Sequence, residues 1–282
     1  MDNSVSPEHI NLRKDDRILP ATRIVLAIVV PFLLLAFLIL YFFPDLSGER
    51  FVWEIKPHMT ALFIGSGYLS GAYMFVYAIF GLQWHRVAGA FPPVISFTTF
   101  MLLSTFLHWD RFNIHHFPFQ LWLVLYIITP PLIFYLWWLN RRTDPVNPES
   151  GEISVPVLAR RAFFWFGVTT MLWAIIMFVF PEVVSTYWPW KLTPLTARIL
   201  AGWFSLLGVG GLYTSSEIRW SAWQIPLQSI TLWAALVVLA SFLNPDDFST
   251  GIWNSFTIGT LLSLLMLLTF QFGIHMTKRK IH

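Results

Sequence analysis

The sequence predicts an all-α integral membrane protein with eight transmembrane helices, arranged as two tandem, parallel four-helix repeats. Of the 282 residues, 56% are hydrophobic and 12% are charged, which is about half the charged fraction of a soluble domain. Several apolar runs reach the roughly 20 residues that a helix needs to cross a bilayer. In addition, one pattern of proline, tryptophan and glycine residues occurs twice along the chain.

The repeated pattern keeps a constant separation of 137 residues, as between Pro44 and Pro181. Matches of these residue types without a gap indicate a tandem duplication, and such a repeat decides how the remaining elements are assigned. The matched pairs are Pro44 and Pro181, Trp53 and Trp190, Pro57 and Pro194, Gly65 and Gly202, and Gly71 and Gly208.

Apolar runs divide the chain into four predicted spans on each side of one polar linker. The linker, residues 141–160, contains several prolines and charges and marks the boundary between the halves. A polar tail, residues 1–22, precedes the first repeat (23–140), and a short tail, residues 278–282, follows the second repeat (161–277). The predicted spans are 24–43, 59–81, 87–107, 118–139, 162–180, 195–213, 222–243 and 252–276.

The distribution of lysine and arginine predicts that both termini are cytoplasmic, because positive charge collects in cytoplasmic loops. With this orientation the outer segments hold only Arg50, Lys56, Arg111, Lys191 and Arg198. An even number of spans per repeat then makes the two repeats parallel, related by an axis along the membrane normal. The inner segments hold Arg13, Lys14, Arg17, Arg23, Arg86, Arg141, Arg142, Arg160, Arg161, Arg219, Lys278, Arg279 and Lys280.

Several classes of function are excluded or disfavoured. The absence of cysteine excludes disulfides, thiolate catalysis and cysteine-ligated metals. No GxSxG, Walker A, HExxH or GxGxxG motif occurs, and the positive charges follow topology rather than a nucleic-acid-binding face. The spans carry almost no ionisable residue at mid-depth, where such a residue would indicate ion coupling. We therefore predict a non-enzymatic binding or accessory subunit, or a permease for a small neutral or lipidic ligand, without a cofactor.

An alternative function uses the histidines of the predicted outer boundary in the first repeat. Imidazole and carboxylate ligands suit zinc, copper or iron, so a metal-dependent enzyme or redox protein at the outer face is the rival hypothesis. Arg198, in the first turn of the sixth span, is a further candidate, either for an anion or headgroup or as an arginine that reaches the interface. The candidate metal ligands are His58, His108, Asp110, His115 and His116.

Small residues form stripes that allow close contact between helices. Gly67 and Gly71 lie four apart in the second span, and Ala197, Ala201 and Ser205 follow the same spacing in the sixth. We expect these two spans to pack together at the centre. The alternatives are a seam between copies of this chain or a contact with a partner in a membrane complex or with lipid.

The segment HWDRFNIHHFPFQLWLVLYIITPPLIFYLWWLNRRTDP, which covers residues 108–145, carries a resemblance to known sequences. It is similar to a stretch in a family of uncharacterised multi-pass membrane proteins of bacteria, and the similarity extends to WxxxPLTAR in the second half. The resemblance implies a protein of the bacterial cytoplasmic membrane. It carries over no activity and no site residue.

Overall fold

Eight long helices run side by side in the computed structural model, which describes residues 15–148, 151–249 and 251–281. All eight are long and apolar enough to cross a membrane, so the predicted number of spans is confirmed. The long helices are α1 (Pro20–Phe42), α3 (His58–Phe80), α4 (His85–Ala88) continued by α5 (Phe91–Leu107), α6 (Phe117–Asn140), α7 (Val157–Val179), α9 (Pro194–Ser216), α10 (Trp220–Leu243) and α11 (Ile252–Ile281).

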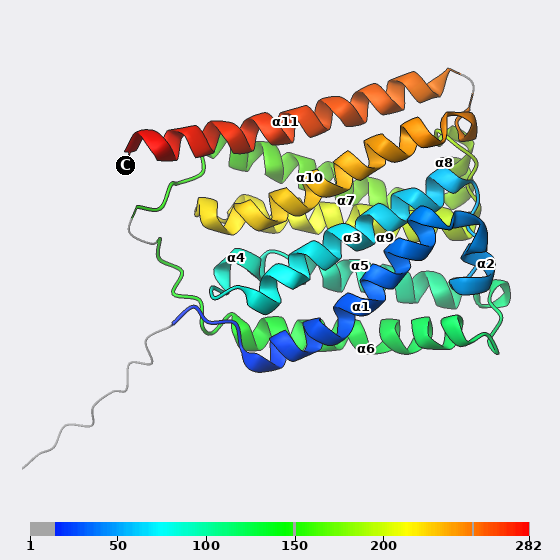
Figure 1. Cartoon of the computed structure of the whole chain (residues 1–282), viewed down its shortest axis with the longest axis horizontal. Coiled ribbons are helices and arrows are strands. Elements are labelled where there is room, and N and C mark those ends of the chain that lie inside the picture. The colour runs from blue at the N-terminus through cyan, green and yellow to red at the C-terminus, as the bar shows by residue number, and fades with distance from the viewer. Residues whose placement is uncertain (1–14, 149–150, 250, 282) are drawn as a thin grey trace, which may run out of the picture.

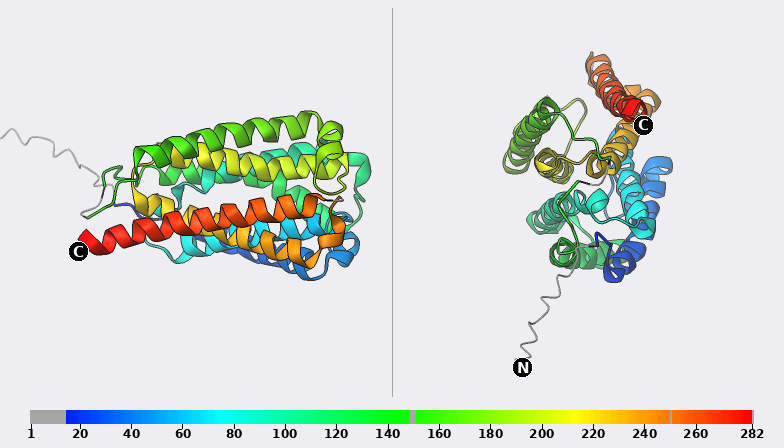
Figure 2. Two further views of the ribbon diagram at one scale, coloured as in Figure 1. Left: turned by 90° about the horizontal axis from the view of Figure 1, so that it is seen from above. Right: turned by 90° about the vertical axis from the view of Figure 1, so that its left-hand side faces the viewer.

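Short elements cap one end of the bundle, which we name the α2 end. They are η1 (Pro44–Leu46), α2 (Ser47–Arg50), η2 (Trp109–Arg111), α8 (Pro181–Tyr187) and η3 (Pro245–Asp247). The opposite end, named the linker end, carries α4, the linker between α6 and α7, and the C-terminal part of α11 (Figures 1 and 2).

The sequence favours these helices because a chain in lipid has to satisfy every backbone polar group internally. Proline stands at the first positions of α1, α5, α6, α8 and α9, where its missing N–H group costs nothing. The helix predicted to begin at residue 162 begins at Val157, directly after Pro156. Its first turns therefore include Arg160 and Arg161, which a membrane helix can carry at its boundary.

The long helices pack in the same order in both halves of the chain. In each half the first helix packs on the second, α1 on α3 and α7 on α9, and the third packs on the fourth, α5 on α6 and α10 on α11. The halves are joined crosswise, since α3 packs against α10 and α9 packs against α5. Figure 2 shows the resulting arrangement from the linker end, with α11 at one edge of the bundle.

The second and sixth spans, α3 and α9, were expected to pack together at the centre, but they are not each other's main partners. The main partners of α3 are α1 and α10, and those of α9 are α7 and α5. Of the small residues in the two predicted stripes, Gly71 faces Leu33 of α1, and Ser205 Oγ accepts from Ser96 Oγ of α5 at 3.0 Å. Other glycines bring α7 and α9 together: a Cβ atom at Gly208 would lie 2.8 Å from the backbone nitrogen of Met171, and one at Gly167 would lie 2.6 Å from that of Leu212. Between α3 and α9 the ring of Trp203 packs against Gly67, and this bulky ring keeps the two backbones apart.

A polar network at the linker end ties the halves together. Asp16 accepts from His85 Nδ1, and His85 Nε2 lies 2.8 Å from Ser221 Oγ. The Ser221 hydroxyl donates in turn to Glu152 of the linker, at 2.8 Å. Asp16, His85 and Ser221 are all buried. The linker, predicted as a polar boundary segment, is thus attached to the start of α10.

A second group of charges lies beside this network. The buried guanidinium of Arg219 donates to Asp144 at 2.8 Å and to Glu217 at 2.6 Å. Burial raises the pKa of both carboxyl groups, but the hydrogen bonds and charge of Arg219 outweigh that effect, so that both pKa values lie below their ordinary range. Both acids are therefore ionised at neutral pH and hold the linker to the end of α9.

Candidate functional site

A cavity of about 250 Å³ runs through the interior of the bundle. Its lining extends from the loop residues Arg50, Phe51 and Val52 at the α2 end to Gly89, at the junction of α4 and α5 near the linker end. It is therefore long in the direction of the helices. Residues of α1, α3, α5, α6, α7, α9 and α10 contribute to its walls.

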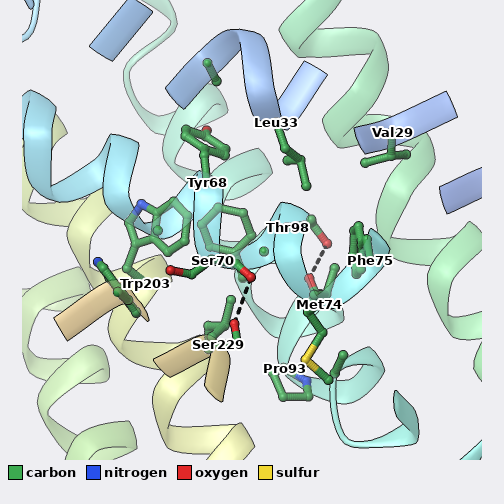
Figure 3. Close-up of a pocket in the computed structure, with 18 of the residues that line it drawn as sticks. Val29, Leu33, Tyr68, Ser70, Met74, Phe75, Pro93, Thr98, Trp203 and Ser229 are labelled. Carbon is green, nitrogen blue, oxygen red and sulfur yellow. Dashed lines mark hydrogen bonds between the residues drawn. The ribbon is translucent and has the colours of Figure 1, made fainter. Parts of the chain in front are cut away.

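The walls of the cavity are overwhelmingly apolar. Figure 3 shows its middle, where Leu33 of α1, Met74 of α3 and Pro93 of α5 surround the space. Among the described residues that line the cavity, Arg50 is the only one with a charged side chain. A charged or strongly hydrated solute would lose its water here without replacement, which costs several kcal/mol.

The hydroxyl groups in the walls are largely occupied by the helix backbone. Ser70 Oγ donates to the carbonyl of Ser66 at 2.9 Å, and Thr98 Oγ1 donates to that of Val94 at 2.8 Å. Ser229 Oγ donates across the helix interface to the carbonyl of Ser70 at 2.8 Å (Figure 3). These hydroxyl hydrogens are therefore used within the protein. The indole N–H of Trp203, which also lines the cavity, has no hydrogen-bond partner among the described residues.

Aromatic side chains form the wall between the two halves. The ring of Trp203 meets the ring of Tyr68 edge-on, with centroids 5.2 Å apart, and lies 4.4 Å from that of Phe97. The hydroxyl groups of Tyr68 and Tyr126 lie 3.2 Å apart. Such interlocked rings make a rigid wall, since each pair contributes about 0.5–1.5 kcal/mol beyond its buried area.

The cavity approaches the lipid between α1 and α6. These two helices meet at the linker end, where the Asn140 amide nitrogen donates to the Thr22 hydroxyl. Toward the α2 end they diverge, as Figure 1 shows. Leu35, on the α1 side of the lining, is 53% exposed. A molecule dissolved in the membrane could therefore enter sideways, without passing through water.

The predicted metal ligands do not gather at one point. His58 Nε2 lies 2.8 Å from Asp45, His108 Nε2 lies 2.7 Å from Arg198, and His116 Nε2 donates to the Glu49 carbonyl at 3.0 Å. The carboxylate of Asp110 pairs with the neighbouring Arg111, and the backbone nitrogen of His115 donates to Asn113. Within the described part of the chain, no group of three or more His, Asp or Glu side chains could hold a metal ion.

Arg198, the predicted anion or headgroup residue, is held by contacts with Phe178 of α7 and with His108. Its Nε donates to the carbonyl of Phe178 at 3.0 Å, and its guanidinium lies 6.0 Å from the centre of the Phe178 ring. Burial and the adjacent Arg198 charge lower the pKa of His108. His108 is therefore neutral at pH 7 and can accept the hydrogen bond from Arg198.

The structure contains an acid–histidine–serine arrangement that resembles a catalytic triad and that the sequence did not reveal. Its members are Asp16, His85 and Ser221. No sequence signal could have found it, because Asp16 lies 69 residues from His85, and His85 lies 136 residues from Ser221. A nucleophilic serine needs its hydroxyl directed at a substrate, whereas Ser221 is 4% exposed and donates to Glu152. We interpret the network as a structural tie between the halves.

Comparison of the chain with protein-family models, with curated proteins and with solved structures finds no match.

Proposed function

We propose that the protein is a non-enzymatic membrane protein that binds a lipid-like ligand in the cavity between α1 and α6. The observation that carries this proposal is the long apolar cavity that residues of both helices line. Its shape suits a hydrocarbon chain, and its walls offer little to a polar solute. A role as an accessory subunit or as a permease for such a ligand is compatible with the same site.

The proposal includes the architecture and orientation that the sequence predicts. The equivalent packing of the two halves supports a tandem duplication into two parallel four-helix repeats. The lysine and arginine distribution supports cytoplasmic termini, so that the α2 end faces outward in a bacterial cytoplasmic membrane. In that orientation α1 and α6 diverge toward the outer leaflet. The first copy of the duplicated pattern then supplies the outer loop that follows α1.

Two glycines provide a matched test of the cavity. A Cβ atom at Gly71 would meet only Leu33 Cδ1, at 3.8 Å, and one at Gly259 of α11 would meet nothing within 4 Å. A phenylalanine at Gly71 would extend into the cavity, whereas a phenylalanine at Gly259 would extend away from it. Both changes remove a glycine from the middle of a helix, so they differ mainly in where the new ring lies.

The experiment uses the full-length protein in vesicles that contain phosphatidylcholine with a photoactivatable diazirine at the end of one acyl chain. Labelled peptides are identified by mass spectrometry. We expect labelling at Met74 and Phe75, which are buried in the lining, and its loss in Gly71→Phe but not in Gly259→Phe. Labelling confined to lipid-facing positions such as Leu262 and Met266, unchanged by Gly71→Phe, would contradict the proposal.

A further inference from the structure

Arg50 is the one charged residue among the described residues that line the cavity, and it lies at the outer end of the lining. It ends the short helix α2, and its side chain is exposed while also lining the cavity. Within the described part of the chain, no hydrogen bond or ion pair occupies its guanidinium. An arginine with free donors at the edge of an apolar channel is suited to an anion that carries a hydrocarbon chain.

The acidic side chains nearby make contacts of their own. Glu54 pairs with Lys56 at 2.5 Å, and Asp45 Oδ1 lies 2.8 Å from His58 Nε2. Glu49 precedes Arg50 in the chain and is exposed, but the two form no ion pair among the described residues. The backbone of Glu49 instead accepts a hydrogen bond from His116 at the start of α6, and this bond fixes the loop beside the mouth.

Apolar surface continues directly from Arg50 into the membrane. Phe51 and Val52 of the loop, Ile39 of α1 and Leu121 of α6 line the cavity next to it. An amphiphile with its headgroup at Arg50 would thus direct its chain between α1 and α6. A free anion such as phosphate would use Arg50 but would leave this apolar surface empty.

We infer that the cavity receives a lipid with an anionic headgroup from the outer leaflet, with the headgroup held at Arg50 and one chain lying between α1 and α6. This inference rests on the proposed function and adds the chemical class of the ligand. The second half of the chain lacks the same charge, since the residue 137 positions after Arg50 is Tyr187. The duplication therefore provides one headgroup position rather than two.

Two photoactivatable probes with identical chains test the inference, one with a phosphatidylglycerol headgroup and one with phosphatidylcholine. Each is added to vesicles that contain the full-length protein, and labelling of the peptide that contains Met74 is compared. Since one arginine near a membrane surface is worth about 1 kcal/mol toward an anionic lipid, we expect the anionic probe to label about fivefold more. Arg50→Ala removes the preference, and Arg50→Lys keeps most of it.

Arg111 supplies the matched control, because it is an exposed arginine at the same end that pairs with Asp110 and does not line the cavity. Arg111→Ala leaves the preference unchanged, and excess inorganic phosphate does not abolish it. Equal labelling by both probes in the wild type, an equal loss in Arg111→Ala, or displacement by free phosphate would each overturn the inference. Absence of labelling at Met74 by either probe would instead overturn the proposed function.

Discussion

Replacement of Arg219 by alanine should destabilise the protein more than replacement of any exposed arginine at the same end. The Arg219 side chain is 4% exposed, and those of Asp144 and Glu217 are 15% and 18% exposed. Removal of one partner from a buried ionic group costs about 3–5 kcal/mol. Because water reaches both acids in part, we take the lower value, about 3 kcal/mol, which corresponds to a decrease in Tm of roughly 6–12 °C.

The assay is thermal unfolding of the purified protein in detergent, followed by tryptophan fluorescence. Arg161→Ala is the control, because Arg161 is exposed at the linker end, and its effect should stay within about 0.5 kcal/mol. Arg219→Lys should lie between the two, since an ammonium group keeps the charge but cannot bind two carboxylates in one plane. A Tm of Arg219→Ala equal to that of Arg161→Ala would refute the interpretation of this group as a tie.

The same group predicts how stability depends on pH. The pKa values of Asp144 and Glu217 in the folded protein lie below their ordinary values of 3.8 and 4.5. Below these ordinary values the unfolded chain binds more protons than the folded one, so stability decreases as pH falls. The wild type should therefore lose Tm between about pH 5 and pH 3, and Arg219→Ala should lose less over the same interval.

Two further predictions concern packing and orientation. A Cβ atom at Gly67 would lie 2.5 Å from the Trp203 ring, so Gly67→Ala should cost about 2 kcal/mol. Gly71→Ala, whose Cβ atom would make only an ordinary contact with Leu33 at 3.8 Å, should be neutral or stabilising in the same unfolding assay. Equal Tm values would contradict the described position of Trp203. Since the natural chain has no cysteine, single cysteines at Lys191 and Arg142 report orientation. A membrane-impermeant maleimide applied to intact cells should label Lys191→Cys but not Arg142→Cys, and the opposite result would reverse the proposed topology.

Much of the fold could be predicted because a bilayer imposes strong rules on sequence. Length and apolarity alone define the spans, and all eight predicted spans correspond to helices. The neighbours of each helix could not be predicted in the same way. A small residue shows that another element comes close, but not which one. Gly65 faces Leu40 of α1, whereas Gly202, 137 positions later in the chain, faces Met101 of α5.

The candidate site was less predictable, because it is made by separate helices that meet only after folding. Its lining residues are ordinary apolar residues such as Leu33 and Phe97, which look the same in sequence whether they face lipid, a neighbour or a cavity. The histidines attracted attention because their chemistry is visible in sequence. In the structure His58, His108 and His116 each bond to a different partner, so the metal hypothesis stays a prediction without a cluster to support it.

If the two halves arose by the proposed duplication, residues needed for the common fold should be alike in both copies. Residues that differ between the copies are then the ones that the common fold constrains least. Trp53 and Trp190 are alike and are both buried among aromatic rings, as expected of a scaffold. The position that holds Ala61 in the first copy holds Arg198 in the second, but Arg198 is bonded to His108 and to the Phe178 carbonyl. Arg50 also differs between the copies, and its guanidinium has no bond in the described chain. A charge that serves neither packing nor pairing, at the mouth of the cavity, is the charge most available to a ligand.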